Sequence, residues 1–234
     1  MRKQQKIWEE EHASPKILPT LEYLEPSNSV IYLVDYLKKT QFPKRGKTVD
    51  IGSGKGRNAI YLAKKGYEVY CLDYVKLALD FTKNYAKKEN VFSKIHLFKT
   101  DIDKPWPFEN DFFDLAIDCF SSIDIETKQG RKVYKEELLR TLKPGGYAMV
   151  TVVSTDDEIE KEFIEKYPGE EPNSSVWPGT DKYQKNYDEK ELRYFYKQFE
   201  ILQIRKIHKQ AFKLGKHYKA TNISTILRKP NDKS

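Results

Sequence analysis

The 234-residue chain has few cysteines and no long apolar run, and both absences narrow its class. Cys71 and Cys119 are its only cysteines, so neither a disulfide framework nor a cysteine-based metal cluster is expected, and no metal is predicted. No apolar run approaches the ~20 residues that cross a bilayer, and the first residues lack the apolar stretch of a signal peptide. These absences predict a cytoplasmic protein without a membrane partner.

The net charge of +7 is distributed unevenly along the chain. Residues 154–191 hold twelve acids and five bases, whereas residues 201–231 hold eight Lys or Arg and no acid. A basic segment of this kind can bind phosphates, which keeps an RNA partner open. Alternation along a strand would instead divide these bases between two faces, and a lysine-rich edge that resists strand pairing is common. Nucleic acid is therefore an alternative partner that we do not favour.

A glycine-rich turn follows the apolar residues 49–51. Gly52, Gly54 and Gly56 occupy alternate positions there and precede a helical pattern. Glycines let the main chain turn sharply and approach a ligand closely, although such turns also serve helix–strand packing alone. A dinucleotide-binding turn would carry its third glycine at the position of Arg57, so a pyrophosphate site is not predicted.

Helical and strand patterns alternate after this turn and predict an α/β domain. Asp73 ends one predicted strand and lies ~20 residues after Gly52, a spacing that suits hydrogen bonds to ribose hydroxyls, with a helix N-cap as the alternative role. The predicted helices cover 29–37, 58–66, 75–89 and 188–196, and the predicted strands cover 67–73, 95–102, 112–120, 147–153, 199–208 and 218–228.

Residues 50–56 resemble the first motif of class I S-adenosylmethionine-dependent methyltransferases, and residues 142–146 are similar to the turn before that family's fifth strand. The resemblance covers residues 47–153. It implies a Rossmann-like, mostly parallel seven-stranded sheet of order 3-2-1-4-5-7-6 with helices on both faces. It also implies S-adenosylmethionine as the cofactor and S-adenosylhomocysteine as the product.

The resemblance places the donor site at the carboxyl ends of the strands. Asp50 is expected to organise the glycine turn, Tyr74 to pack on adenine, and Asp101 with Ile102 to contact the adenine edge. The full set of expected cofactor-binding residues is Asp50, Gly52, Ser53, Gly54, Gly56, Asp73, Tyr74, Asp101, Ile102 and Asp118.

Missing motifs restrict the acceptor. The fourth strand lacks the Asn/Asp-Pro-Pro-Tyr/Phe motif of enzymes that methylate exocyclic base amines, and no paired cysteines suit pyrimidine C5 methylation. Residues 56–69 are similar to a small-molecule subgroup that includes tellurite-resistance and thiol methyltransferases. We therefore expect a small-molecule acceptor. An RNA methyltransferase and a non-catalytic S-adenosylmethionine-binding subunit remain the alternatives, and the sequence does not indicate an oligomeric state.

The acceptor is expected to contact parts of the chain outside residues 47–153. Residues 1–46 are expected to form a helical lid, and residues 47–230 the methyltransferase domain, with an acceptor-side insertion at 154–187. The candidate acceptor contacts are aromatic: Trp8, Phe120, Trp177, Tyr183 and Tyr187. A catalytic base is optional in methyl transfer, and the candidates, none of them preferred, are His12, Asp118, His208 and His217. Trp8 and His12 share one expected helix face, although His12 could instead be exposed while Trp8 packs on the core.

Overall fold

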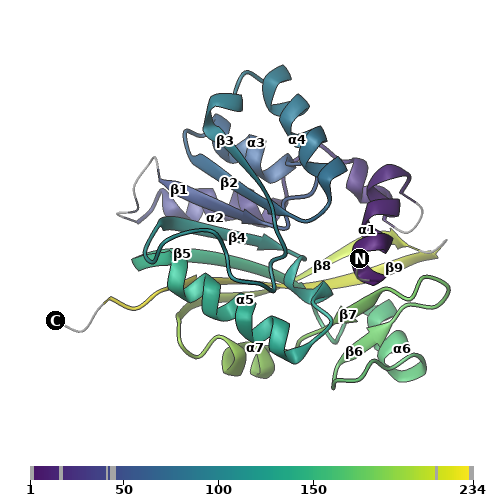
Figure 1. Ribbon diagram of the computed structural model, residues 1–234. Helices are drawn as coiled ribbons and strands as arrows, with labels where there is room; N and C mark the ends of the chain where they lie inside the picture. Colours follow the sequence, from purple (N-terminus) through teal and green to yellow (C-terminus); the bar gives the residue numbers. More distant parts are fainter. Residues whose placement is uncertain (1–2, 16–17, 41, 43–45, 214–215, 232–234) are drawn as a thin grey trace.

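One seven-stranded sheet organises the computed structural model, which describes residues 3–15, 18–40, 42, 46–213 and 216–231 (Figure 1). Its order is β3-β2-β1-β4-β5-β9-β8, in which β9 is antiparallel to both β5 and β8 and the other pairs are parallel. The strands are β1 (Lys47–Ile51), β2 (Glu68–Asp73), β3 (Ile95–Lys99), β4 (Phe113–Cys119), β5 (Leu142–Val153), β8 (Glu200–Lys213) and β9 (Lys216–Arg228). The predicted order is confirmed, because β8 and β9 are the sixth and seventh strands of this sheet along the chain.

Helices cover both faces of the sheet. They are α1 (Lys3–Ala13), α2 (Asn28–Leu37), α3 (Arg57–Lys64), α4 (Lys76–Lys88), α5 (Lys128–Thr141), α6 (Glu158–Lys166) and α7 (Glu189–Phe195). Side chains alternate along β2, so that Tyr70 and Leu72 belong to the core that includes residues of α5 and α7, whereas Val69 and Cys71 belong to the core that includes residues of α2, α3 and α4. The two resulting cores fix the strands whose carboxyl ends carry the site. No described helix is long and apolar enough to cross a bilayer.

In the parallel part of the sheet, β5 and β3 have boundaries that differ by several residues from the sequence prediction. β5 begins at Leu142 and runs through the Pro-Gly-Gly turn, because the pairing with β4 shifts register between Phe113 and Leu115 and accommodates it. Gly145 there has φ +75°, and its N–H donates to the carbonyl of Lys229 at 2.9 Å. β3 ends at Lys99, three residues before the predicted end of that strand.

The 154–187 insertion is folded. It contains α6 and a two-stranded sheet of β6 (Ser174–Val176) and β7 (Tyr183–Lys185). Asp157 caps α6 by accepting hydrogen bonds from the N–H groups of Ile159 and Glu160 at 3.2 and 3.1 Å. A capped helix and a hairpin can hold this segment at a defined place beside the large sheet.

The β8–β9 hairpin is longer than predicted. β5 pairs with β9 only over residues 222–228, so residues 208–213 and 216–221 project past the sheet as an arm. Figure 1 shows this arm reaching toward α1 and α6. The arm was not predicted, because the lysines of residues 206–219 interrupt the alternation of apolar and polar residues that marks a strand.

Candidate functional site

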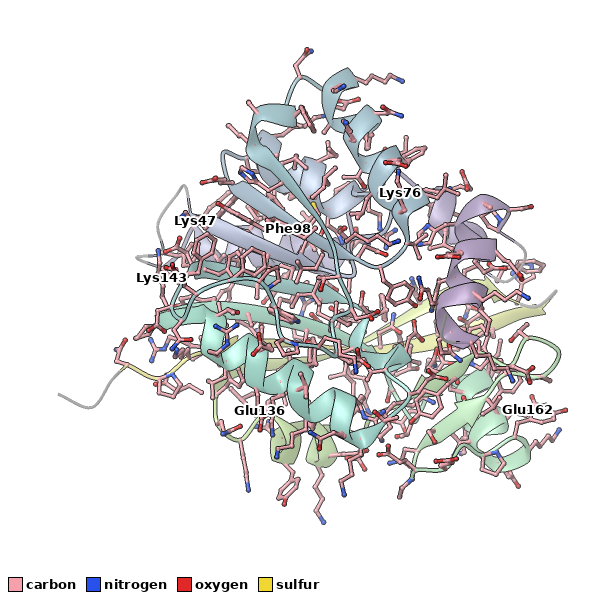
Figure 2. All side chains as sticks on the ribbon, viewed as in Figure 1. Lys47, Lys76, Phe98, Glu136, Lys143 and Glu162 are labelled. Atoms are coloured by element: carbon pink, nitrogen blue, oxygen red, sulfur yellow. The ribbon has the colours of Figure 1, made fainter. Side chains whose placement is uncertain are left out.

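A cavity of about 760 Å³ opens at the carboxyl ends of β1 and β2. Its walls include the glycine turn, α1, the turns after β2, β3 and β4, the 177–184 segment and the β8–β9 arm. Lys47 and Lys143 lie at the opposite end of the sheet from α1 (Figure 2). The position matches the general rule that open α/β sheets bind ligands beyond the carboxyl ends of their strands.

The glycine turn serves both packing and access. Gly52, Gly54 and Gly56 have φ of +63°, +54° and +77°, a region that disfavours residues with a Cβ. A Cβ on Gly52 would lie 2.1 Å from Ser121 Oγ, and one on Gly56 would lie 2.5 Å from Thr82 Cγ2. A Cβ on Gly54 would lie 3.4 Å from His12 Cε1, which is ordinary van der Waals contact. Gly52 and Gly56 are thus required by packing as well as by their positive φ, whereas Gly54, which lines the cavity, is restricted by its φ.

Asp73 holds the glycine turn against β2. Its Oδ2 accepts a hydrogen bond from the Gly54 N–H at 2.8 Å, and its Oδ1 accepts one from the Val75 N–H at 2.8 Å. Burial raises the pKa of this carboxyl to about 6, against the lowering effect of these bonds. Asp73 lines the cavity, and the N–H groups of Gly54, Tyr74 and Val75 together leave one of its roughly four lone-pair sites for a ligand hydroxyl. Ribose binding by Asp73 stays a prediction.

Asp50 is a buried carboxylate with an unsatisfied oxygen. It is 2% exposed, lines the cavity, and its Oδ2 has no hydrogen-bond partner among the described residues. Burial, together with the nearby charges of Asp118 and Asp73, raises the pKa of Asp50 to about 7. A positively charged ligand would relieve this cost. Four other predicted cofactor-binding residues also line the cavity: Ser53, Tyr74, Asp101 and Ile102.

Asp118 does not have the position that we predicted. Its carboxylate is fully buried, lies outside the cavity wall, and accepts hydrogen bonds from the Ser121 N–H at 2.8 Å and the Tyr134 hydroxyl at 2.7 Å. These bonds hold the turn after β4. We therefore withdraw Asp118 both as a cofactor contact and as a catalytic base.

The predicted acceptor contacts divide into two groups. Trp8, Phe120 and Trp177 line the cavity. Tyr183 and Tyr187 do not, because the hydroxyl of Tyr183 accepts a hydrogen bond from Arg131 at 3.3 Å and Tyr187 is buried in the core beneath α7. The last two tyrosines stabilise the insertion, and their assignment to the acceptor is corrected.

The three candidate histidines have different surroundings. His12 is 6% exposed and lines the cavity, so the alternative of an exposed His12 is wrong. Its Nδ1 has no hydrogen-bond partner among the described residues, and burial followed by the charge of Lys55 lowers its pKa to about 4. His217 is at the cavity edge, 5.0 Å from the Phe212 ring between centroids. His208 is exposed outside this cavity and bonds to Thr221 Oγ1 at 3.1 Å, so it is withdrawn as a base.

Lys182 is a cavity residue that the sequence analysis missed. Its Nζ lies 2.6 Å from Asp124 Oδ1 and 3.2 Å from Gln184 Oε1. The same nitrogen lies 4.3 Å from the ring centroid of Trp177 and 5.3 Å from that of Trp8. No sequence signal separates this lysine from the many exposed lysines of the chain. Within the described part of the chain, no group of three or more His, Cys, Asp or Glu side chains could hold a metal ion.

Comparison with known proteins agrees with this architecture. Residues 48–146 match the family model described as a methyltransferase domain. The chain is 29% identical over 129 residues to a sarcosine/dimethylglycine N-methyltransferase of Aphanothece halophytica, covering 55% of this chain and 45% of that protein. It is 24% identical over 157 residues to the probable S-adenosyl-L-methionine-dependent methyltransferase TehB of Haemophilus influenzae, covering 67% and 47%.

A solved structure extends the likeness to most of the fold. A SAM-dependent methyltransferase of Methanosarcina mazei has a TM-score of 0.73 and 20% identity, covering 88% of this chain and all of that one. The chain spans about half the length of the curated relatives that it matches. The strand order, the matched segment and these relatives show that the chain has the fold of class I S-adenosylmethionine-dependent methyltransferases and is similar to them in sequence over residues 48–146.

Proposed function

We propose that the protein transfers a methyl group from S-adenosylmethionine to a small-molecule acceptor. The observation that carries this proposal is the cavity beside the glycine turn, in which the buried Asp50 has an unsatisfied oxygen while α1 encloses the other side. The names of the relatives support both parts, since TehB is described as S-adenosyl-L-methionine-dependent and the Aphanothece enzyme acts on sarcosine and dimethylglycine.

The donor side of the cavity fits this cofactor. The sulfonium and ammonium groups of S-adenosylmethionine are cationic, and the cavity wall at Asp50, Asp73 and Asp101 is acidic. Gly54 leaves room for close approach of the ligand to the main chain. When bound, the cofactor supplies an electrophilic methyl carbon on sulfur. The protein's part is to align the acceptor in line with that carbon and to exclude water.

We propose that α1 is a lid over the acceptor. The Nζ of Lys3 lies 3.0 Å from Asp181 Oδ2, and Gln4 Nε2 donates a hydrogen bond to the Asp181 carbonyl at 3.1 Å. Lys55 of the glycine turn forms an ion pair with Glu22, just beyond this helix. α1 and the segment that contains Glu22 therefore contact the insertion and the glycine turn, respectively. His12 is neutral near pH 7, because burial and Lys55 lower its pKa to about 4; its imidazole can accept a hydrogen bond from the O–H or N–H of the acceptor, while the same low pKa makes it a weak base.

Replacing Asp73 with asparagine should weaken the binding of S-adenosylhomocysteine by about 10- to 100-fold. The amide keeps one acceptor oxygen for the backbone but loses the charge, and a hydrogen bond to a charged group contributes about 1.5–3 kcal/mol. Isothermal titration calorimetry measures the dissociation constant. Asp80→Asn, on the exposed face of α4, is the control and should bind as the unaltered protein does. Equal affinity of a folded Asp73→Asn variant would contradict the ribose assignment.

Incubation with labelled S-adenosylmethionine and fractionated cell extract tests the transfer itself. We expect label in the small-molecule fraction. Label in RNA would support the RNA methyltransferase alternative. Donor binding without label in any fraction would support a non-catalytic subunit.

The basic C-terminal segment gives limited support to an RNA acceptor. Lys206 is paired with Asp156, Arg228 with Glu200, and Lys229 with Asp111, the last at 2.6 Å. Arg205 stacks on the ring of Tyr32, with Cζ 3.6 Å from its centroid. The side chains of Lys213 and Lys216 lie outside the described residues.

We expect total tRNA to bind weakly and with a shallow dependence on salt. Neutralising ~6 or more phosphates would make affinity fall by orders of magnitude between low and moderate salt. The measurement is a titration of labelled tRNA across a salt series. It is repeated on a variant with Lys206, Lys209, Lys213 and Lys216 changed to Ala. Submicromolar binding with a steep salt slope that the variant loses would favour the RNA alternative.

A further inference from the structure

The acceptor side of the cavity contains a filled cation site. Two tryptophan rings, a carboxylate and an amide oxygen surround the ammonium of Lys182, whose side chain is 3% exposed. Aromatic faces together with a carboxylate are the groups that recognise an ammonium ligand. Because the protein places its own ammonium there, an acceptor amine would meet a like charge. The cage therefore disfavours cationic acceptors.

Two acids of this part of the cavity wall already have partners within the protein. Asp124 pairs with Lys182 itself at 2.6 Å. Asp157 caps α6 and also accepts a hydrogen bond from the Thr221 N–H of the arm at 2.9 Å. Lys209 on the arm adds a second cation to the cavity wall. An anion that enters this half of the cavity thus meets Lys182 and Lys209, while Asp124 and Asp157 are held by Lys182 and by the arm; Glu126 is a further acid of the cavity wall.

The cavity face of α1 adds two polar groups and one ring. Gln4, Trp8 and His12 follow one another at four-residue intervals, so they share a face of about 12 Å at a rise of 1.5 Å per residue, and all three line the cavity. Gln4 Oε1 and His12 Nδ1 are buried without a hydrogen-bond partner among the described residues. His12 faces Gly54 on the donor side, and Gln4 contacts the turn beside Lys182. Trp8 lies between them. This row suits a flat molecule with a polar group at each end.

We propose that the acceptor is a planar aromatic anion. Its ring packs on Trp8, its anionic group pairs with the Lys182 ammonium, and its nucleophilic O–H or N–H faces His12. The acceptor oxygen or nitrogen forms a bond to the methyl carbon as the carbon–sulfur bond breaks, and its proton passes to the His12 imidazole. The products are the methylated acceptor, the neutral thioether and a proton, which His12 releases to solvent. This inference rests on the proposed methyl transfer and specifies the acceptor for the same site.

Three phenols of similar size, which differ in the charge of the para substituent, test the charge preference of the acceptor site. They are 4-hydroxybenzoate, 4-hydroxybenzamide and 4-hydroxybenzylamine, titrated by saturation-transfer NMR into protein saturated with S-adenosylhomocysteine. We expect the carboxylate to bind at least about tenfold more tightly than the other two, as a charge-assisted contact in a desolvated pocket implies. Lys182→Met should remove this preference. Lys185→Met is the matched control, because Lys185 is also buried and ion-paired, with Glu191 at 2.6 Å, but lies outside the cavity wall.

Each outcome decides one point. Equal or tighter binding of the amide or the amine, or failure of all three probes to bind, would overturn the proposal. Retention of carboxylate preference in Lys182→Met would do so as well. The ranking of probes by the unaltered protein stands even if Lys182→Met does not fold. Failure to bind S-adenosylhomocysteine, measured first, would instead count against the proposed function.

Discussion

Replacing Gly52 with alanine should destabilise the protein by about 3 kcal/mol. A residue with a Cβ at positive φ costs ~1–2 kcal/mol, and an overpacked site adds ~1–3 kcal/mol. Both costs apply, because Gly52 has φ +63° and its added Cβ would lie 2.1 Å from Ser121 Oγ and 2.4 Å from Ser121 Cβ. Ser121 has little freedom to move, since its N–H is bonded to Asp118. Chemical denaturation measures the free energy of unfolding.

Gly54→Ala is the matched substitution in the same turn, and it should act on binding more than on stability. Its φ of +54° carries the same backbone cost, but its Cβ would enter the cavity and meet only His12 at 3.4 Å. We expect about 1 kcal/mol of destabilisation, together with a loss of S-adenosylhomocysteine affinity that exceeds the loss in a folded Gly52→Ala sample. Equal stability of the two variants would contradict the packing role of Gly52. Unchanged affinity of Gly54→Ala would contradict close approach of the ligand.

The strands of the sheet were predictable because each is marked by a local run of apolar residues in the sequence. The strands of a βαβ domain are short apolar runs, and the glycine turn fixed the place of β1 among them. The ends of β5 and of the β8–β9 arm were not predictable in the same way. Residues 142–146 join the sheet through a register shift against β4, and the arm contacts the start of α6, where the Thr221 N–H donates a hydrogen bond to Asp157. Both depend on contacts between distant segments, which one-dimensional periodicity does not contain.

The functional site likewise combines residues that the sequence predicted with residues that only the folded chain brings together. Asp50 and Asp118 both lie on buried strands and are alike in sequence terms, yet only Asp50 lines the cavity. The difference comes from the turn after β4, whose N–H groups and the Tyr134 hydroxyl occupy the Asp118 carboxylate. Lys182 and Trp177 are brought beside Trp8 by the hairpin of the insertion. Such juxtapositions require the folded chain.

The affinity for S-adenosylmethionine should rise by up to about tenfold between pH 6 and pH 8. The pKa of Asp50 is raised to about 7, so this carboxyl is mostly protonated at pH 6 and mostly ionised at pH 8. A cationic ligand binds the ionised form, and binding therefore releases a proton. His12 stays neutral throughout this pH range, because its pKa is lowered to about 4. Asp73, with a pKa of about 6, ionises in the lower part of this pH range.

The stability of the ligand-free protein should change in the opposite direction. A carboxyl whose pKa is raised on folding stabilises the native state fully below its unfolded pKa near 4 and loses that contribution as the pH rises through 7. His12 opposes this trend below pH ~6.5, since its unfolded form binds more protons there, but has no effect above it. Between pH 6.5 and 8 the free energy of unfolding should therefore fall without ligand.

Asp50→Asn separates these effects from the titration of the ligand itself. The amide cannot ionise, so the variant should lose most of the rise in affinity above pH 6.5 while keeping any part that arises from the ligand's own amino group. Calorimetry in two buffers of different ionisation enthalpy measures the protons released on binding. The unaltered protein should release more protons near pH 6.5 than the variant does. Equal release by the two proteins would show that Asp50 is not the carboxylate that the donor's positive charge meets.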